Sequence, residues 1–570
     1  MSDEIHFSID GQECTARRGE TILAAALRNG VQIPHYCWHP GLSVAGNCRM
    51  CLVFVEPGPP KPVIACSTEV QEGMKVEHAS ARTKEAREGV LEFLLANHPL
   101  DCPICDQAGE CDLQQYSFDH GRSESKFVDV KTQAHRKDFG PLIRFNGNRC
   151  IKCTRCVRFC QEVTDTHELT LIDRSDHAII DVFPGVPLDN PLSGCTADLC
   201  PVGALLEKDS IHSTRVWLLR GTKSVCGECA TGCNVNVEVF EESVKRITPR
   251  ENQATNKWWM CDEGRLSHRA RQSPTRLREA RMGGASVSDA EALEAAREAV
   301  AAAGAGRVAG LATGHATNEE LYLLKLLVDG GPLGVAYRPE GASFRARDGF
   351  EISADKNPNR EGVRRVLGEV DGGEAVRRAV AAGSVDVLLV LDGVPGGAPW
   401  DPDLLAAAWR ADTTIVALCF EDGGWAGSAG IALPAPHWTE QDGTYVNARG
   451  RLQRLRPAVP LPGDARPSLE VLQELAHAAG RVPRVLSAGG VFRRLSASLP
   501  GSFGKLDYRS VGAYGVPLPG ASDDTPPEAC STGYEAGPKS RAPGRAKDEQ
   551  VRISVHRESP AGYGTLRGDV

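Results

Sequence analysis

The uneven distribution of cysteine is the feature that most constrains this chain of 570 residues. Eighteen of its 20 cysteines lie in residues 1–261, and only Cys419 and Cys530 lie beyond. The acidic start, Met1 to Glu4, has no apolar segment behind it, so we expect no secretory signal and no oxidising compartment. Closely spaced cysteines in such a chain predict metal sites rather than a disulfide scaffold.

Composition and charge exclude several classes of protein. Apolar residues make up 41% and charged residues 24% of the chain, which is typical of globular domains and not of disorder. A net charge of −9 and a pI near 6.0 give no basic signal for nucleic-acid binding. No apolar run approaches the ~20 residues of a membrane helix. The length predicts about three to five domains.

The first ligand set has the spacing C-x10-C-x2-C-x14-C and consists of Cys37, Cys48, Cys51 and Cys66. Four thiolates from one long loop and a returning strand suit a [2Fe–2S] cluster. Gly46 and Asn47 precede Cys48 and allow the backbone to bend and direct N–H groups at the sulfurs. The alternative is structural zinc, which usually shows two short CxxC-like pairs where this set has one.

The second set has the spacing H-x3-C-x2-C-x5-C and consists of His98, Cys102, Cys105 and Cys111. Three thiolates leave one iron of a [4Fe–4S] cluster without a ligand, and an imidazole can complete it. Replacing a thiolate by a neutral imidazole removes one negative charge and raises the reduction potential, as in Rieske centres. Zinc, or a His98 that is an ordinary loop residue, remain the alternatives.

The third set joins a C-x2-C-x2-C run to a remote Cys-Pro and consists of Cys150, Cys153, Cys156 and Cys200. This run is the signature of bacterial ferredoxins and predicts a [4Fe–4S] cluster. Cys160 and Cys195 supply only two of the four thiols that a further cluster needs, so we expect both to be buried non-ligands. Lys152, Arg155 and Arg158 would place positive charge near the cluster and favour its reduced form.

The fourth set has the spacing C-x2-C-x3-C-x27-C and consists of Cys226, Cys229, Cys233 and Cys261. Three close thiolates and one remote thiolate again predict a [4Fe–4S] cluster, with zinc as the alternative. The four sets together predict one [2Fe–2S] cluster and three [4Fe–4S] clusters. The remaining Cys14, Cys160, Cys195, Cys419 and Cys530 show no catalytic pattern, so we expect free structural thiols and no catalytic residue.

Periodicity predicts a multidomain chain with α+β and α/β parts. Ile5 to Ile9 alternates before the turn Asp10-Gly11, and a helix from Thr21 to Leu27 completes a β-grasp pattern. An amphipathic helix is expected over 80–97, with Val90, Leu91, Phe93, Leu94 and Leu95 on or near one face. Beyond residue 275, expected helices at 289–303 and 319–328 alternate with strands at 307–311, 385–391 and 414–418, which indicates an open α/β sheet.

The predicted domains follow the ligand sets. We expect a [2Fe–2S] ferredoxin-like domain at 1–80, a [4Fe–4S] segment with one histidine and three cysteine ligands at 81–120, a [4Fe–4S] ferredoxin-like domain at 141–210, a further [4Fe–4S] segment at 219–275, an α/β domain at 276–500 and an irregular or disordered tail at 501–570. No substrate site stands out. Gly304 to Ala309 mimics a dinucleotide fingerprint but precedes a strand, so we reject it as a cofactor loop. Redox centres without a substrate site predict an electron conduit.

Four motifs extend these predictions to a family. Residues 42–51 read LSVAGNCRMC, residues 98–113 read HPLDCPICDQAGECDL, residues 150–159 read CIKCTRCVRF and residues 200–205 read CPVGAL. This part of the chain resembles the large iron–sulfur subunit of NADH–quinone oxidoreductase (respiratory complex I). Further on, Asp442 to Asn447 and Gly450 to Gln453 resemble that family's C-terminal domain, a truncated relative of molybdopterin oxidoreductases.

The resemblance implies an electron-transfer role as a subunit of the proton-translocating NADH:quinone oxidoreductase. The first three clusters would pass electrons from the flavin of the NADH-binding subunit towards other peripheral-arm iron–sulfur subunits and quinone. The Cys226 set would be structural or vestigial, and the C-terminal domain would hold no molybdopterin. The subunit would lie on the cytoplasmic side of the plasma membrane and associate with it only through the complex. No nucleic acid is expected as a partner.

Other classes remain as alternatives. The chain could be the diaphorase or electron-input subunit of a hydrogenase or formate dehydrogenase complex, although the diaphorase type ordinarily lacks the fourth set and the long C-terminal domain. A catalytic formate dehydrogenase needs a longer region after the clusters and a metal-ligating Cys, and Cys419 lies on an apolar strand pattern. An iron-only hydrogenase needs further Cys motifs. A zinc-stabilised scaffold without redox activity is distinguished by visible absorption and iron content.

Overall fold

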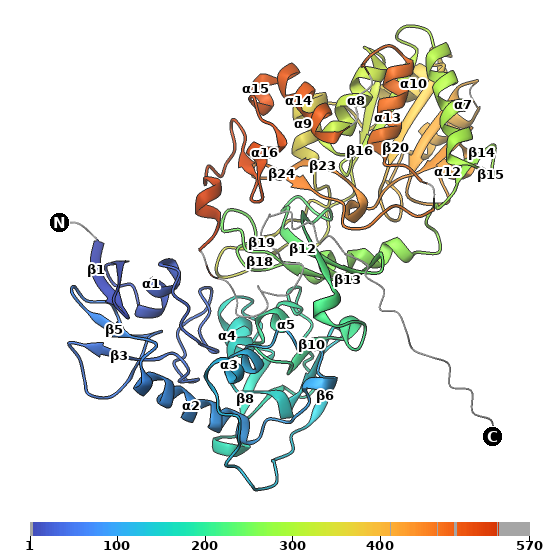
Figure 1. The fold of residues 1–570 in the computed structure, drawn as a ribbon. Helices are drawn as coiled ribbons and strands as arrows, with labels where there is room; N and C mark the ends of the chain where they lie inside the picture. The colour runs from blue at the N-terminus through green and yellow to red at the C-terminus, as the bar shows by residue number, and fades with distance from the viewer. Residues whose placement is uncertain (1–3, 411, 464, 484–486, 533, 535–570) are drawn as a thin grey trace, which may run out of the picture.

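The structure is a computed structural model that describes residues 4–410, 412–463, 465–483, 487–532 and 534. Figure 1 shows an N-terminal domain beside a loop-rich cyan region, a small green sheet above it, and an α/β lobe at the opposite end of the molecule. No helix among these residues combines the length and apolar character needed to cross a bilayer.

The N-terminal domain is the predicted β-grasp. Its strands are β1 (Glu4–Ile9), β2 (Gln12–Arg17), β3 (Leu52–Glu56), β4 (Val63–Ile64) and β5 (Lys75–Glu77), in the order β2-β1-β5-β3-β4. Helix α1 (Ile22–Arg28) begins where the Thr21 side chain accepts a hydrogen bond from the Ala24 amide, as an N-cap does. Alternate residues of the first hairpin, such as Phe7 and its partner Cys14, are buried beneath this helix.

Helix α2 (Ala81–Ala96) joins the β-grasp to the loop-rich region. The buried Arg87 donates hydrogen bonds of 2.9 Å to the backbone oxygens of Leu52 and His78, which attaches the helix to the sheet. The predicted apolar face is wrong at Phe93, whose exposed fraction is 85%, because α2 packs on β3 and on α3 (Asp112–His120) through the side around Leu91.

Short elements separated by long loops make up residues 98–275. They are η1 (Cys102–Ile104), α3 (Asp112–His120), β6 (Arg136–Asp138), β7 (Ile143–Asn146), η2 (Gly147–Arg149), α4 (Arg155–Glu162), β8 (Leu169–Ile172), η3 (Ser175–His177), β9 (Ile179–Val182), α5 (Cys195–Leu199), β10 (Leu205–Glu207), η4 (Lys208–Ser210), η5 (Val216–Leu218), β11 (Arg220–Val225), β12 (Asn234–Phe240), β13 (Ser243–Pro249), α6 (Asp262–Leu266) and η6 (Ser267–Gln272). The strands form sheets in the orders β10-β7-β6, β8-β9 and β11-β12-β13. One hydrophobic cluster runs through this region and contains or borders cysteines of all four ligand sets.

The α/β lobe is built on a mainly parallel sheet, as expected. Its strands are β14 (Ala280–Met282), β15 (Ala285–Val287), β16 (Val308–Thr313), β17 (Leu333–Ala336), β20 (Val387–Asp392), β21 (Thr414–Cys419) and β22 (Ile431–Pro434), in the order β15-β14-β22-β21-β20-β16-β17. Alternate residues of β20 point to opposite faces, because Leu389 packs in one hydrophobic cluster and Leu388 in another. The lobe therefore has apolar cores on both sides of its sheet.

Helices cover both faces of this sheet. The first face packs on α7 (Asp289–Ala302), α8 (Asn318–Val328), α9 (Arg360–Leu367), α13 (Ser468–Ala478) and α14 (Ala488–Ser498), and the second on α10 (Glu374–Ala381), α11 (Pro402–Arg410) and α12 (Trp425–Ser428). Small sheets β18 (Phe344–Arg345) with β19 (Glu351–Ile352), and β23 (Gly443–Val446) with β24 (Arg451–Leu455), join the lobe to the loop-rich region, together with η7 (Trp438–Glu440).

The prediction of an irregular or disordered tail after residue 500 is wrong for residues 501–532. These contain α15 (Pro500–Phe503), α16 (Tyr508–Val511), β25 (Val516–Pro517), which pairs with β24, and η8 (Pro527–Cys530). The elements are too short to show periodicity, and buried side chains such as Phe503, Val511 and Cys530 hold them against the rest of the protein. Residues 535–570 of the predicted tail lie outside the described residues.

Candidate iron–sulfur cluster sites

The first set forms two pairs of thiols. The side chains of Cys37 and Cys48 are hydrogen-bonded to each other, as are those of Cys51 and Cys66. The Cys37 sulfur also accepts backbone N–H groups of Asn47 and Cys48, which the positive φ of Gly46 (63°) helps to direct, as expected. The hydrogen bond from the Cys48 thiol lowers the pKa of Cys37 to about 5. Two pairs of buried thiols fit a cluster of two irons with two thiolates on each.

The third set lines a small cavity whose other walls are mainly apolar. All four cysteines line it: Cys150, Cys153, Cys156 and Cys200. Burial raises the pKa of Cys150 to about 12 and of Cys153 to about 11. Four such thiols can be deprotonated together only if a cation compensates their charge. The donor set and its surroundings fit a [4Fe–4S] cluster.

In the second set, His98 supplies an unpartnered nitrogen. Its Nδ1 is buried and has no hydrogen-bond partner among the described residues. Burial, with the nearby charges of Arg149 and Lys131, lowers the pKa of His98 to about 4, so the imidazole is neutral near pH 7. A neutral imidazole with a free nitrogen is what a metal ligand requires. Cys105 is buried, Cys111 is partly buried and Cys102 is exposed.

The fourth set is buried on all sides. Cys226, Cys229, Cys233 and Cys261 are each 5–6% exposed. The Gly264 amide donates a hydrogen bond of 3.3 Å to the Cys261 sulfur. A Cβ atom on Gly264 would lie 2.9 Å from the Cys226 sulfur, so only glycine leaves the room that these thiols occupy. Four buried thiol donors fit the ligand set of a further [4Fe–4S] cluster.

Two buried arginines of α4 connect the third set to the first. The Arg158 guanidinium donates a hydrogen bond of 2.5 Å to the Cys37 carbonyl oxygen and a second to that of Ser43. Arg155 donates to the carbonyl oxygens of Trp38 (2.5 Å) and Leu199 (3.3 Å), the neighbours of Cys37 and Cys200. The sequence predicted positive charge from Arg155 and Arg158 near the third set, but it did not predict the backbone oxygens that these side chains bind. Both ligand loops are thereby held against α4.

The loop after Cys200 connects the third set to the second. A Cβ atom on Gly203 would lie 2.4 Å from the Cys105 sulfur, so the backbone passes directly against that thiol. The carbonyl oxygen of Pro201 accepts a hydrogen bond of 2.9 Å from the Asp112 amide. Arg149 and Asp101, which precede Cys150 and Cys102, form a largely buried ion pair of 2.9 Å.

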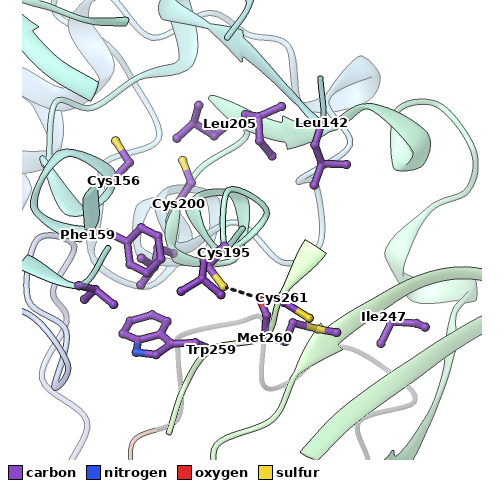
Figure 2. Packing of buried hydrophobic residues seen from close by; sticks show 14 of the residues in the cluster. Leu142, Cys156, Phe159, Cys195, Cys200, Leu205, Ile247, Trp259, Met260 and Cys261 are labelled. Atoms are coloured by element: carbon purple, nitrogen blue, oxygen red, sulfur yellow. Dashed lines mark hydrogen bonds between the residues drawn. The ribbon is translucent and has the colours of Figure 1, made fainter. Parts of the chain in front are cut away.

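Polar contacts of α5 connect the third set to the fourth. Figure 2 shows Cys195 between Cys200 and Cys261, and its thiol donates a hydrogen bond of 3.3 Å to the Met260 carbonyl oxygen. The Asp262 carboxylate accepts a bond of 2.8 Å from the Gly194 amide, and Arg265, 1% exposed, pairs with Asp198. The third set is therefore at the centre and contacts the loops of the other three sets.

The other cysteines lie in buried positions. Cys14, Cys160, Cys195 and Cys530 are at most 3% exposed, and Cys419 lies on β21 in the α/β lobe, also 3% exposed. In the described part of the chain, no group of three or more His, Cys, Asp or Glu side chains is arranged to hold a single metal ion. The fit of each ligand set therefore rests on donor type, burial, hydrogen bonds and unpartnered atoms.

Five family models match the chain, in the order of the predicted domains. They are the 2Fe-2S iron-sulfur cluster binding domain at 2–81, the NADH-ubiquinone oxidoreductase-G iron-sulfur binding region at 87–126, the NADH-quinone oxidoreductase subunit 3 ferredoxin-like domain at 140–206, the molybdopterin oxidoreductase Fe4S4 domain at 219–271 and molybdopterin oxidoreductase at 356–478. Domains that bind [2Fe–2S] and [4Fe–4S] clusters are thus present, and the first four of these models each cover one of the ligand sets.

Curated relatives are similar to the N-terminal half of the chain. The NADH-quinone oxidoreductase G subunit of Rickettsia bellii is 43% identical over 264 residues, which cover 46% of this chain and 39% of that protein. The mitochondrial NADH-ubiquinone oxidoreductase 78 kDa subunit of Neurospora crassa is 46% identical over 266 residues, which cover 46% of this chain and 36% of that protein. Over these residues the chain is similar to the large iron–sulfur subunit of NADH-quinone oxidoreductase. Its matched part spans less than half the length of these relatives.

One further curated relative and one solved structure are also similar to parts of the chain. The NADH-quinone oxidoreductase G subunit of Rickettsia typhi is 38% identical over 329 residues, which cover 57% of this chain and 48% of that protein. A solved structure of an NAD+-reducing [NiFe]-hydrogenase covers 37% of this chain and 91% of the hydrogenase chain, with 29% identity and a TM-score of 0.34.

Proposed function

We propose that this chain is an electron-transfer subunit of NADH–quinone oxidoreductase that holds one [2Fe–2S] and three [4Fe–4S] clusters on the four ligand sets. The observation that carries the proposal is the central position of the third set, whose loops contact those of the other three. When bound, the clusters would supply sites that accept and release single electrons. The chain would carry no catalytic substrate site of its own.

The contacts between sets support one order of transfer. Arg155 and Arg158 hold the first set against the third, and the loop from Pro201 to Gly203 holds the third against the second. The first, third and second sets thus form a continuous row of loops. In this order, electrons from a flavin-bearing subunit would enter at the first set and leave at the second.

The surroundings of the second set support contact with a further subunit. Cys102 is exposed, and it lies between the exposed apolar side chains of Leu100 (91%) and Ile104. Trp217 and Leu218 are also exposed, and they lie on η5, where the preceding Arg215 donates a hydrogen bond of 2.8 Å to the Cys105 carbonyl oxygen. Apolar side chains exposed around a ligand loop are typical of a surface that a partner covers. We propose that another iron–sulfur subunit binds here.

The fourth set and the α/β lobe have supporting roles in this proposal. The fourth set contacts the third through α5 but is not part of the row from the first set to the second. The α/β lobe would hold no molybdopterin, and Cys419, its only cysteine before residue 530, is enclosed within β21. Peripheral association with the cytoplasmic side of the membrane would follow from assembly with the other subunits of the complex.

Reduction by NADH through a partner tests the proposal. The full chain, purified anaerobically, is mixed with NADH alone and then with NADH plus the flavin-binding subunit from the same organism, and the clusters are followed by electron paramagnetic resonance (EPR). We expect no reduction by NADH alone and rapid reduction once the flavoprotein is added. A chain that oxidises NADH by itself, or clusters that stay oxidised beside an active flavoprotein, would contradict it. The matched control is Cys153→Ser, which should interrupt reduction of the second-set cluster.

A further inference from the structure

The C-terminal segment of the described chain returns to the cluster region. Figure 1 shows it in dark red, running from the α/β lobe towards the N-terminal domains. The Cys530 carbonyl oxygen accepts a hydrogen bond of 2.8 Å from the Gln253 amide, and the Thr532 amide donates one of 2.8 Å to the Glu251 carboxylate. These contacts fix the segment beside the Fe4S4 region and direct it towards the junction of the first and third sets.

Tyr534 ends this path in an aromatic recess. Its ring centroid lies 5.1 Å from that of His39, 5.6 Å from that of Trp38 and 6.1 Å from that of His35. These three residues surround Cys37 in the sequence, so the tyrosine packs on the loop that carries the first ligand of the first set. His39 in turn stacks on Trp259, two residues before Cys261.

The hydroxyl of Tyr534 is hydrogen-bonded to the Arg155 side chain. Arg155 is 4% exposed, lies between Cys153 and Cys156 in the sequence, and donates to the carbonyl oxygens of Trp38 and Leu199. Its Nε has no hydrogen-bond partner among the described residues. The acceptors around this buried guanidinium are therefore few, and the tyrosine oxygen is one of them.

We propose that Tyr534 is a positioning residue that orients Arg155 and thereby sets the reduction potential of the third-set cluster. The inference rests on the proposed function, since it concerns the cluster that the third ligand set would hold. A buried N–H that loses its acceptor must find another, because an unsatisfied donor is costly in an apolar interior. Besides Tyr534, the anionic group that acts most strongly on the Arg155 charge is the Cys153 thiolate, followed by the Asp112 carboxylate and the Cys48 thiolate. A hydrogen bond to a cluster thiolate stabilises the reduced cluster and raises its potential.

The test is a redox titration of the anaerobically purified full chain, monitored by EPR. In Tyr534→Phe the ring keeps its aromatic contacts and only the hydroxyl is lost. We expect the third-set potential to rise while the first-set potential stays unchanged. The matched control is Tyr322→Phe, which removes the hydroxyl of a partly buried tyrosine in the α/β lobe and should shift neither potential.

A double-mutant cycle shows whether the effect passes through Arg155. If it does, Tyr534→Phe adds no shift in an Arg155→Lys background. A shift of equal size in both backgrounds would overturn the positioning role, and so would an unchanged third-set potential in Tyr534→Phe at full iron content. A wild-type chain that holds no third-set cluster would instead contradict the proposed function itself, so the two failures are distinguishable. Thermal unfolding of each variant checks that the fold is retained.

Discussion

The loop-rich cluster region and the α/β lobe fill their interiors by different means. In residues 98–275 the helices and strands are short, and thiols and buried arginines lie among the apolar side chains of one hydrophobic cluster. In the α/β lobe, parallel strands such as β20 are buried along their whole length and are covered by helices on both faces. We therefore expect the first region to depend on bound clusters for its stability, whereas the second depends on hydrophobic burial.

Removal of iron should have the largest effect and should act on the two regions differently. Without iron, the buried thiols must stay protonated and the loops lose their cross-links, so residues 37–261 should become mobile. The α/β lobe should keep its structure, because its core contains no ligand. Hydrogen exchange of chelator-treated and intact protein, measured by region, would show this difference. Equal protection of both regions after complete iron loss would contradict the account.

Single cysteine substitutions on α4 sharpen the assignment of ligands. Cys156→Ser should abolish the EPR signal of the third-set cluster and lower the iron content, since an alcohol is a poor ligand for iron. Cys160→Ser, one turn further along the same helix, should keep the iron content because we predict no ligand role for this buried thiol. If Cys160→Ser loses the cluster and Cys156→Ser keeps it, Cys160 is the ligand and Cys156 is not, which would contradict the prediction.

A buried ion pair where the α/β lobe meets η6 of the cluster region tests the stability of the lobe. The Glu440 carboxylate accepts hydrogen bonds of 2.6 Å from Arg276 and 2.7 Å from Arg271, and its side chain is fully buried. Glu440→Gln leaves buried guanidinium charge uncompensated, which should lower the free energy of unfolding of this lobe by about 3–5 kcal/mol. Denaturant unfolding measures the change, and the cluster spectra should be unaltered. If Glu440→Gln loses its clusters before the lobe unfolds, the stability of the cluster region depends on the lobe, which would contradict this expectation.

The smallest expected effect is a pH dependence of the α/β lobe. Burial lowers the pKa of His315 from 6.5 to about 3, and both its ring nitrogens are buried and without hydrogen-bond partners among the described residues. Between pH 6.5 and 3 the unfolded chain binds this proton and the folded chain does not. The stabilising contribution is therefore complete above pH 6.5 and is lost as the pH falls.

The matched variant is His315→Gln, which cannot titrate in this range. The unfolding free energy of the lobe, measured at pH 7 and pH 5, should fall less steeply in the variant than in the wild type. The same slope in both proteins would show that His315 does not contribute.

Local signals in the sequence predicted much of this architecture. The first hairpin, the helix at Thr21 and the α/β alternation beyond residue 275 follow from periodicity and capping, and the family models support the order of the domains. The ligand sets follow from spacing, and their assignment to particular clusters stays a prediction.

Contacts over long sequence separations were not predictable. Nothing near Arg155 in the sequence indicates that it binds the backbone at Trp38, 117 residues away, and nothing near Tyr534 indicates the recess around His39. The exposure of Phe93 and the short elements after residue 500 depend in the same way on what packs against them. Spacing shows which thiols belong together, but only the fold shows which set lies at the centre.

We propose that the four ligand sets hold one [2Fe–2S] and three [4Fe–4S] clusters. Mössbauer spectroscopy of the full chain, grown with ⁵⁷Fe and purified anaerobically, tests it most directly when combined with iron, zinc and sulfide analysis. We predict the spectra of both cluster types, cubane iron well in excess of [2Fe–2S] iron, and no stoichiometric zinc. Zinc on one or more sets, or the absence of a [2Fe–2S] component, would contradict the account.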